Sequence, residues 1–191
     1  MTVLTPQTLA GGGVVLFALG WLHRVPRIAR WDAKLFLALH KSLRRALPLF
    51  RWLWHLGRLW GLLGGAVLIA LGLGWRKGLA VVIAYGVVVL GETTIKRLVR
   101  RPRPYQVLPE ATMGQPLEPV DSSFPSGDAL RIWLLALTLM AWLPPVWTVP
   151  LVVVAVAVSL GRIALGVHHP LDVISGTGLG FLAAALALWL A

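Results

Sequence analysis

The chain has 191 residues, of which 58% are hydrophobic and only 13% are charged. This composition is too apolar for a soluble domain, so a membrane is the expected surrounding. No cysteine is present, which excludes disulfides, thiolate catalysis and cysteine-ligated metals. The net charge of +11 would suggest nucleic acid in a soluble protein. Here the basic residues are confined to short loops between apolar stretches, so we expect membrane lipids and no nucleic acid as partners.

Apolar stretches recur along the whole chain, and several are long enough, or can be extended enough, to cross the hydrocarbon as helices. They lie near Val3–Leu22, Leu59–Trp75, Leu79–Leu90, Leu130–Leu143, Val146–Leu160 and Val173–Ala191. The pattern predicts an all-α, polytopic membrane bundle of about six transmembrane helices, with residues 1–191 forming one domain. The first stretch lacks the flanks of a cleaved signal peptide, so we expect it to be retained and the mature protein to start near Met1.

A basic segment, Arg24–Arg51, follows the first stretch. Asp32 is placed to begin a helix with an apolar stripe at i, i+4 spacing and cations around it. The stripe consists of Leu35, Leu39 and Leu43, and the cations are Lys34, Lys41 and Arg45. Such an amphipathic helix would lie in the membrane interface. A basic loop that sets the topology is the alternative, and both interpretations can hold together.

Three polar clusters interrupt the apolar pattern, at Lys96–Pro104, Phe124–Asp128 and Gly161–Asp172. A proline-rich loop, from Arg100 to Phe124, separates the first two. Odd-numbered spans end, and even-numbered spans begin, at the same membrane face. Chain direction alone therefore places all three clusters at one end of the bundle, where they can form a site.

The residue types in these clusters suit phosphoryl transfer, in which positioning and neutralisation of the phosphate oxygens supply most of the catalysis. Lys96, Arg103 and Arg162 supply cations. Ser126 and Gly127 fall where a helix begins, so their amides and the Ser126 hydroxyl can face an anion.

His168 supplies a neutral nitrogen nucleophile, and Asp172, four residues later, can hold the other ring nitrogen in the required tautomer. No convincing metal-ligand cluster is present, and we expect neither a metal nor a cofactor.

At these residues the sequence resembles the type-2 phosphatidic acid phosphatase superfamily of integral membrane lipid phosphate phosphatases. The family pattern is K-x6-RP, then PSGH, then SR-x5-H-x3-D. Lys96 to Arg103-Pro104 matches the first element, and Arg162, His168 and Asp172 match the third at the family spacing. Three elements in order at one membrane depth are specific, whereas one alone would not be. The resemblance covers roughly residues 30 to 190.

The resemblance implies that His168 attacks phosphorus, that Asp172 orients it, and that no metal is required. It assigns phosphate binding to Lys96, Arg103, Ser126, Gly127 and Arg162. The sequence departs from the family at two positions. Gly161 replaces the serine before the arginine, and Asp128 stands where the family has the histidine that protonates the leaving oxygen.

Asp128 bears on the choice of substrate. A carboxylate beside Lys96, Arg103 and Arg162 is expected to be a poor proton donor. An alkoxide leaving from a monoester needs a proton, whereas a phosphate leaving from a diphosphate carries its own charge. We therefore expect a polyprenyl diphosphate to be favoured over phosphatidic acid or phosphatidylglycerol phosphate. His169 is an alternative acid.

Other polar residues are interpreted as outside the site. Arg97, Arg100 and Arg101 are expected to meet headgroups or set topology, and His23, His40 and His55 to be interfacial. Glu92 and Arg131 lie near helix ends and are also left out, with Glu92 pairing with Lys96 at i+4.

Two other functions remain open, a lipid phosphotransferase that shares the phosphohistidine, and a lipid-phosphate binding or transport protein without turnover. A plasma or inner membrane is the expected location. The positive-inside rule places the site in the cytoplasm, because the basic segment lies on the site face. The resemblance instead favours the outer face, which we prefer. The oligomeric state cannot be inferred.

Overall fold

The computed structural model describes residues 4–191, and within this range the regular structure is entirely helical. The α-helices are α1 (Pro6–Gly20), α2 (Pro26–Leu43), α3 (Leu47–Gly57), α4 (Leu59–Leu73), α5 (Trp75–Val99), α6 (Pro104–Val107), α7 (Gly127–Trp142), α8 (Thr148–Ala164) and α9 (Pro170–Leu190). Three short 3-10 helices connect them, namely η1 (Trp21–Arg24), η2 (Arg44–Ala46) and η3 (Pro145–Trp147). The expected all-α fold is confirmed.

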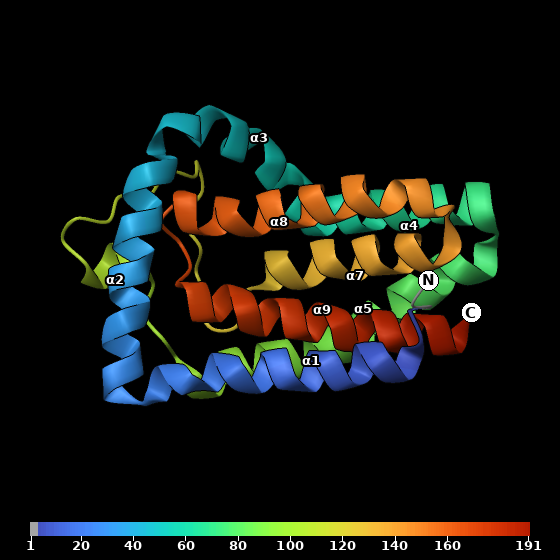
Figure 1. Cartoon of the computed structure of the whole chain (residues 1–191), viewed down its shortest axis with the longest axis horizontal. Coiled ribbons are helices and arrows are strands. Elements are labelled where there is room, and N and C mark those ends of the chain that lie inside the picture. The colour runs from blue at the N-terminus through green and yellow to red at the C-terminus, as the bar shows by residue number, and fades with distance from the viewer. Residues whose placement is uncertain (1–3) are drawn as a thin grey trace.

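Each of the six predicted apolar stretches falls on a helix, and these helices, α1, α4, α5, α7, α8 and α9, lie side by side as a bundle (Figure 1). The predicted start near Met1 and the first residue of the first stretch, Val3, lie outside the described residues. In the described part of the chain, three helical segments are long and apolar enough to cross a membrane alone: Trp75–Val107, Pro145–Ala164 and Pro170–Leu190. A bent pair, Pro6–Arg24 with Pro26–Gly57, raises the number to four. The chain is an integral membrane protein, and six is an approximate count of its spans.

Small residues allow α1 and α9 to pack closely along their length. A Cβ on Gly13 of α1 would lie 2.9 Å from the Gly178 carbonyl oxygen of α9. Close approach of backbones at small residues replaces the hydrophobic driving force that is missing between helices in lipid. α9 also packs against α5 and α7, so the first turn of α9 is held firmly at one end of the bundle.

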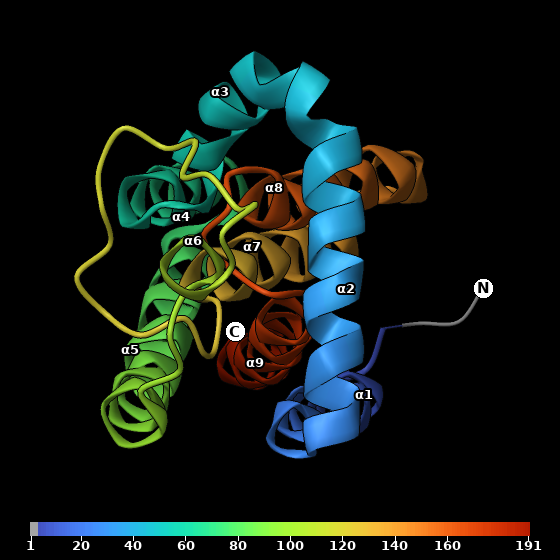
Figure 2. The same ribbon diagram turned by 90° about the vertical axis from the view of Figure 1, so that its left-hand side faces the viewer.

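Helix α2 crosses this end of the bundle instead of continuing along it, because the chain bends by 102° between α1 and α2 (Figure 2). The predicted interfacial helix is therefore present, but its start was predicted wrongly. It begins at Pro26, so Asp32 lies inside the helix and is not its first residue. Leu35 of the predicted apolar stripe is 51% exposed, so it does not pack into the bundle.

The face of α2 that is buried consists of Asp32, Phe36 and His40, which are spaced four residues apart. His40 was expected at the interface, but it is buried against the bundle. Its Nδ1 lies 3.2 Å from the Ile163 carbonyl oxygen, and its Nε2 accepts from the Thr112 amide at 3.3 Å. α2 is thus attached to the bundle through polar contacts as well as apolar ones.

The polar segment between α5 and α7 folds over the same end of the bundle (Figure 2). It contains only the single-turn helix α6, as its many prolines predict. α5 ends at Val99 because Arg100 takes the left-handed conformation, with a φ of 48°. The chain then turns inward, and Arg101 and Arg103 become largely buried.

Candidate active site

A cavity of about 390 Å³ lies where α5 and α8 end and α7 begins. Its lining includes six of the eight predicted site residues, namely Lys96, Arg103, Gly127, Asp128, Arg162 and His168. The other two, Ser126 and Asp172, lie behind this lining. The prediction that the three polar clusters converge at one end of the bundle is therefore confirmed.

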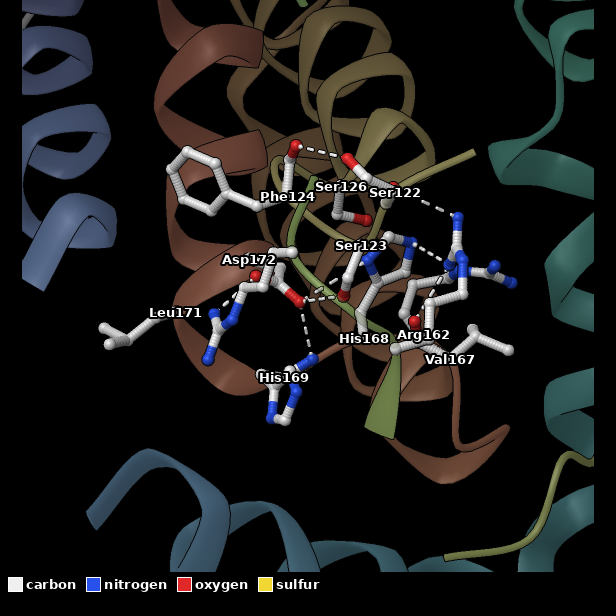
Figure 3. Close-up of polar contacts among 12 residues, drawn as sticks. Ser122, Ser123, Phe124, Ser126, Arg162, Val167, His168, His169, Leu171 and Asp172 are labelled. Carbon is white, nitrogen blue, oxygen red and sulfur yellow. Dashed lines mark hydrogen bonds and ion pairs between the residues drawn. The ribbon is translucent and has the colours of Figure 1, made fainter. Parts of the chain in front are cut away.

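His168 lies in the short connection between α8 and α9 and is 2% exposed. Its Nε2 is 3.4 Å from Nη1 of Arg103. Its Nδ1 is buried, 3.8 Å from Oδ2 of Asp172, and has no hydrogen-bond partner among residues 4–191. In Figure 3, Asp172 lies on one side of the His168 ring and Arg162 on the other. One ring nitrogen thus faces a carboxylate and the other faces cations.

The ring of His168 is held in its neutral form. Burial is the main cause that lowers the pKa of His168 to about 3. Asp172 opposes this shift, and the nearby guanidinium groups of Arg103 and Arg162 add to it. A neutral imidazole has a lone pair on one nitrogen, which is the chemical requirement for a nucleophile.

Asp172 is completely buried in the first turn of α9, and both of its oxygens have partners. Oδ1 accepts from Nη1 of Arg101 at 2.6 Å. Oδ2 accepts from the Ser123 hydroxyl and from the His169 amide, the latter at 2.8 Å. The spacing to His168 Nδ1 is longer than a hydrogen bond, so Asp172 faces that nitrogen without yet bonding to it.

Lys96 and Arg103, two of the cations predicted to bind phosphate, both pair with the carboxylate of Asp121. Asp121 was not among the predicted site residues. Asp121 accepts from Lys96 Nζ at 2.5 Å and from Arg103 Nη2 at 2.6 Å. Burial opposes ionisation, but these two cations lower the pKa of Asp121 to about 2. A carboxylate therefore lies where Lys96 and Arg103 converge.

The surroundings of Asp128 correct the expectation that Lys96, Arg103 and Arg162 would enclose it. Its partners are Arg162, with Nε 2.9 Å from Oδ2, and Arg131, which binds Oδ1 through Nη2. Arg131 also donates to the Gly57 carbonyl at 2.7 Å and to the Tyr85 hydroxyl at 3.1 Å. Both oxygens of Asp128 are therefore engaged by guanidinium groups.

One nitrogen of the Arg162 guanidinium group is available to donate hydrogen bonds to a ligand. Its Nη2 donates to Gln115 at 3.0 Å, whereas its buried Nη1 has no hydrogen-bond partner among residues 4–191. A buried donor without a partner is costly, and an anion in the cavity would satisfy it.

Ser126 lies at the start of a helix, as the sequence predicted. It is the N-cap residue of α7, where its hydroxyl accepts from the Ala129 amide at 3.5 Å and its own amide donates to the Asp172 carbonyl at 3.0 Å. Its polar groups thus fix the start of α7, and Gly127, the next residue, lines the cavity.

Sequence reasoning missed several residues at the site. Glu92 and Arg131 were left out, yet both line the cavity, and Glu92 pairs with Lys96 at 3.2 Å as its i+4 spacing indicated. Arg101, interpreted as a headgroup residue, is paired with Asp172 inside the protein. The i+3 spacing of Asp128 and Arg131 was a usable signal, whereas Arg101 lies 71 residues from its partner and gave none.

Comparison with known proteins places these residues in a family context. The family model described as the PAP2 superfamily matches residues 75–191. A curated protein from Sulfolobus acidocaldarius, named undecaprenyl-diphosphatase, is 38% identical over 106 residues, which are 55% of this chain and 50% of that protein. The chain thus aligns with about half the length of this relative.

Two solved structures have the same fold. One is the first transmembrane PAP2 type phosphatidylglycerolphosphate phosphatase from Bacillus subtilis, with a TM-score of 0.75 and 24% identity over 97% of this chain and 94% of that one. The other is Aquifex aeolicus LpxE, with a TM-score of 0.71 and 24% identity over 82% of this chain and 93% of that one.

The lowered pKa of His168 leads to a prediction for the ring itself. We expect ¹⁵N NMR of histidine-labelled protein to show a His168 ring that stays neutral down to about pH 4, because its pKa is about 3. Since an unfolded histidine titrates near 6.5, this group favours the fold fully above pH 6.5 and progressively less as the pH falls toward 3. A His168→Gln variant identifies the resonance. A midpoint between pH 6 and 7 for that resonance would contradict the prediction.

Proposed function

We propose that this chain, which belongs to the PAP2 superfamily, is a membrane phosphatase that removes the terminal phosphate of a polyprenyl diphosphate through a phosphohistidine intermediate. The proposal also identifies residues 1–191 as one catalytic domain. It needs no metal or cofactor, because the cations of the cavity can neutralise the phosphate oxygens.

The placement of His168 carries the proposal. Its Nε2 faces Arg103, which can only donate, so the lone pair of the neutral ring belongs on Nε2 and the proton on Nδ1. A phosphate held at Lys96 and Arg103 would therefore present its phosphorus to a lone pair. Asp172 faces the protonated nitrogen, where it can stabilise the positive charge that the ring gains on attack.

In the first step the Nε2 lone pair of His168 forms a bond to the terminal phosphorus. The bond from that phosphorus to the bridging oxygen breaks, and the lipid monophosphate leaves with the electron pair. In the second step water attacks the phosphohistidine, the nitrogen–phosphorus bond returns its electrons to Nε2, and inorganic phosphate is released. Both steps pass charge onto phosphate oxygens, which Lys96, Arg103 and Arg162 are placed to stabilise.

The state of Asp128 supports a diphosphate as the substrate. Because its Oδ1 accepts from Arg131 and its Oδ2 forms an ion pair with Arg162, the carboxylate is stabilised in its charged form and is a poor proton donor to a leaving alkoxide. A lipid monophosphate leaves without one. The name of the Sulfolobus acidocaldarius relative, undecaprenyl-diphosphatase, agrees with this choice.

We also propose that the site faces the outer side of the plasma or inner membrane. The basic segment from Arg24 to Arg51 lies at the site end, and Arg76 and Lys77 lie at the other, so charge alone would favour the cytoplasm. The outer face follows from the resemblance of the motifs to lipid phosphate phosphatases that commonly act there.

The proposed intermediate gives the first functional prediction. His168→Ala should abolish phosphate release from a polyprenyl diphosphate, because His168 is the one histidine that lines the cavity among residues 4–191. With substrate labelled at the terminal phosphate, an alkaline quench of the wild-type enzyme should retain protein-bound label that acid removes. His55→Ala, at an exposed position on α3, is the matched control and should behave as wild type. Near wild-type turnover by His168→Ala would rule out the mechanism.

Asp128 gives a prediction about substrate choice. The wild-type enzyme should have a higher kcat/KM for a polyprenyl diphosphate than for phosphatidic acid, at matched detergent and pH. Asp128→His restores a proton donor and should raise the ratio of monoester to diphosphate kcat/KM by at least about tenfold. Combining it with Arg131→Met removes the arginine that the substitution leaves unpaired. Equal wild-type rates on the two substrates would show that the leaving group does not govern the choice.

Orientation can be tested because the sequence contains no cysteine. Single cysteines are introduced at Lys41, exposed on α2, and at Arg76, exposed at the opposite end of the bundle. A membrane-impermeant maleimide added to intact cells should label the cysteine at position 41, and should label the one at 76 only after permeabilisation. The reverse pattern would place the site in the cytoplasm.

A further inference from the structure

We propose that Arg101 and Asp32 are positioning residues for the reaction, which join the interfacial helix α2 to Asp172 and thereby set the orientation of the His168 ring. This inference rests on the proposed function for its kinetic test. Neither residue lines the cavity, so both act through Asp172.

Arg101 forms two ion pairs in different directions. Its Nη1 is 2.6 Å from Oδ1 of Asp172, and its Nη2 is 2.6 Å from Oδ2 of Asp32. The Arg101 side chain is 10% exposed, and those of the two carboxylates are 0% and 2% exposed, so the pairs are shielded from water. A guanidinium group has donors in a fixed plane, so it fixes the relative positions of the two carboxylates.

Asp32 adds a second connection to the same turn of α9. Its Oδ1 accepts from the Leu171 amide at 3.0 Å, and this amide has no partner within its own helix because it belongs to the first turn. Asp32 therefore caps α9 from a different helix while it holds Arg101. α2 therefore reaches the first turn of α9 by two routes, directly at the Leu171 amide and through Arg101 at Asp172 itself.

The consequence is that Asp172 has a single permitted orientation. Arg101 holds Oδ1, so Oδ2 must remain on the side where it meets the Ser123 hydroxyl, the His169 amide and Nδ1 of His168. Without Arg101, the carboxylate could rotate about its last bond. Nδ1 of His168 would then lose the carboxylate that it faces, and the orientation of Nε2 toward phosphorus would no longer be fixed.

A role in positioning differs from a role in stability alone. Substrate phosphate would bind to Lys96, Arg103 and Arg162, none of which contacts Arg101 or Asp32 through a polar contact among residues 4–191. Loss of Arg101 should therefore impair the chemical step and leave substrate binding largely intact.

The test compares Arg101→Ala, Arg101→Lys and Asp32→Asn with the wild type, as full-length protein in the same detergent, with a polyprenyl diphosphate as substrate. Arg97→Ala and Lys34→Ala are the controls, because both residues are exposed, Arg97 four residues before Arg101 at the end of α5 and Lys34 two residues after Asp32 on α2. For each variant kcat, KM and the thermal midpoint are measured. The ¹⁵N shifts of the His168 ring are also recorded, which needs no turnover.

We expect Arg101→Ala to lower kcat by about 100-fold with a nearly unchanged KM, since a misplaced catalytic group costs rate by this order. Arg101→Lys keeps the charge but can form only one of the two ion pairs well, so its kcat should lie between that of Arg101→Ala and that of the wild type. Asp32→Asn keeps the acceptor for Leu171 and should lower kcat by about tenfold, less than loss of Arg101. Guanidinium ion added at millimolar concentration should partly restore kcat to Arg101→Ala, and the controls should behave as wild type.

Wild-type kcat in Arg101→Ala would overturn the inference. So would a fall in kcat that follows the unfolded fraction and that guanidinium does not reverse. A wild-type chain that releases no phosphate would refute the proposed function instead. In that case the ¹⁵N resonances of the His168 ring test the positioning role without turnover. Resonances that shift in Arg101→Lys and Asp32→Asn, but not in Arg97→Ala, would support this role. Unchanged resonances in all three variants would overturn it.

Discussion

The arrangement of the site depends on one fully buried carboxylate, that of Asp172. A buried charge is tolerated only where it is paired and hydrogen-bonded, because its desolvation would otherwise outweigh any gain from packing. Asp172 meets this requirement through Arg101, the Ser123 hydroxyl and the His169 amide. These partners come from the loop after α5, from the segment before α7 and from the start of α9. The hydrogen bonds and ion pair of one carboxylate thus bring together the three segments that carry the polar clusters identified in the sequence.

The same requirement explains why the end of the bundle is rich in paired charges. Lys96 and Arg103 share Asp121, and Arg131 and Arg162 share Asp128. The two acids differ in exposure, because the Asp121 side chain is 48% exposed and that of Asp128 only 10%. On the proposed function, a substrate phosphate entering the cavity exchanges with the exposed carboxylate and leaves the buried one in place. The cations are then already oriented when substrate arrives, which lowers the cost of reorganisation.

Much of this fold could be predicted from the sequence, because hydrophobic length and chain direction are local properties. Both the six stretches and the convergence of the three clusters were correct. The face of α2 that packs against the bundle was not predicted, for a physical reason. Leu35, Leu39 and Leu43 predicted an apolar stripe for the membrane interface, whereas the face buried against the bundle carries Asp32 and His40, whose partners lie far away in the chain. A polar residue is buried when a distant partner satisfies it, and sequence pattern around the residue does not reveal that partner.

Asp128 is the opposite case, because its partner Arg131 is close in the sequence. The spacing between the two residues was visible, but the sequence alone did not show that they form an ion pair at the cavity. Arg131 follows Asp128 by three residues on α7, a spacing that places both on one face. The guanidinium group of Arg131 is fixed by the Gly57 carbonyl and the Tyr85 hydroxyl, so it holds Asp128 from α3 and α5 at once. Asp128 in turn holds Nε of Arg162 and leaves Nη1 of that arginine without a partner in the described chain. The acid at position 128 therefore orients Arg162 through an ion pair. On the proposed function, this arrangement suits a leaving group that needs no proton.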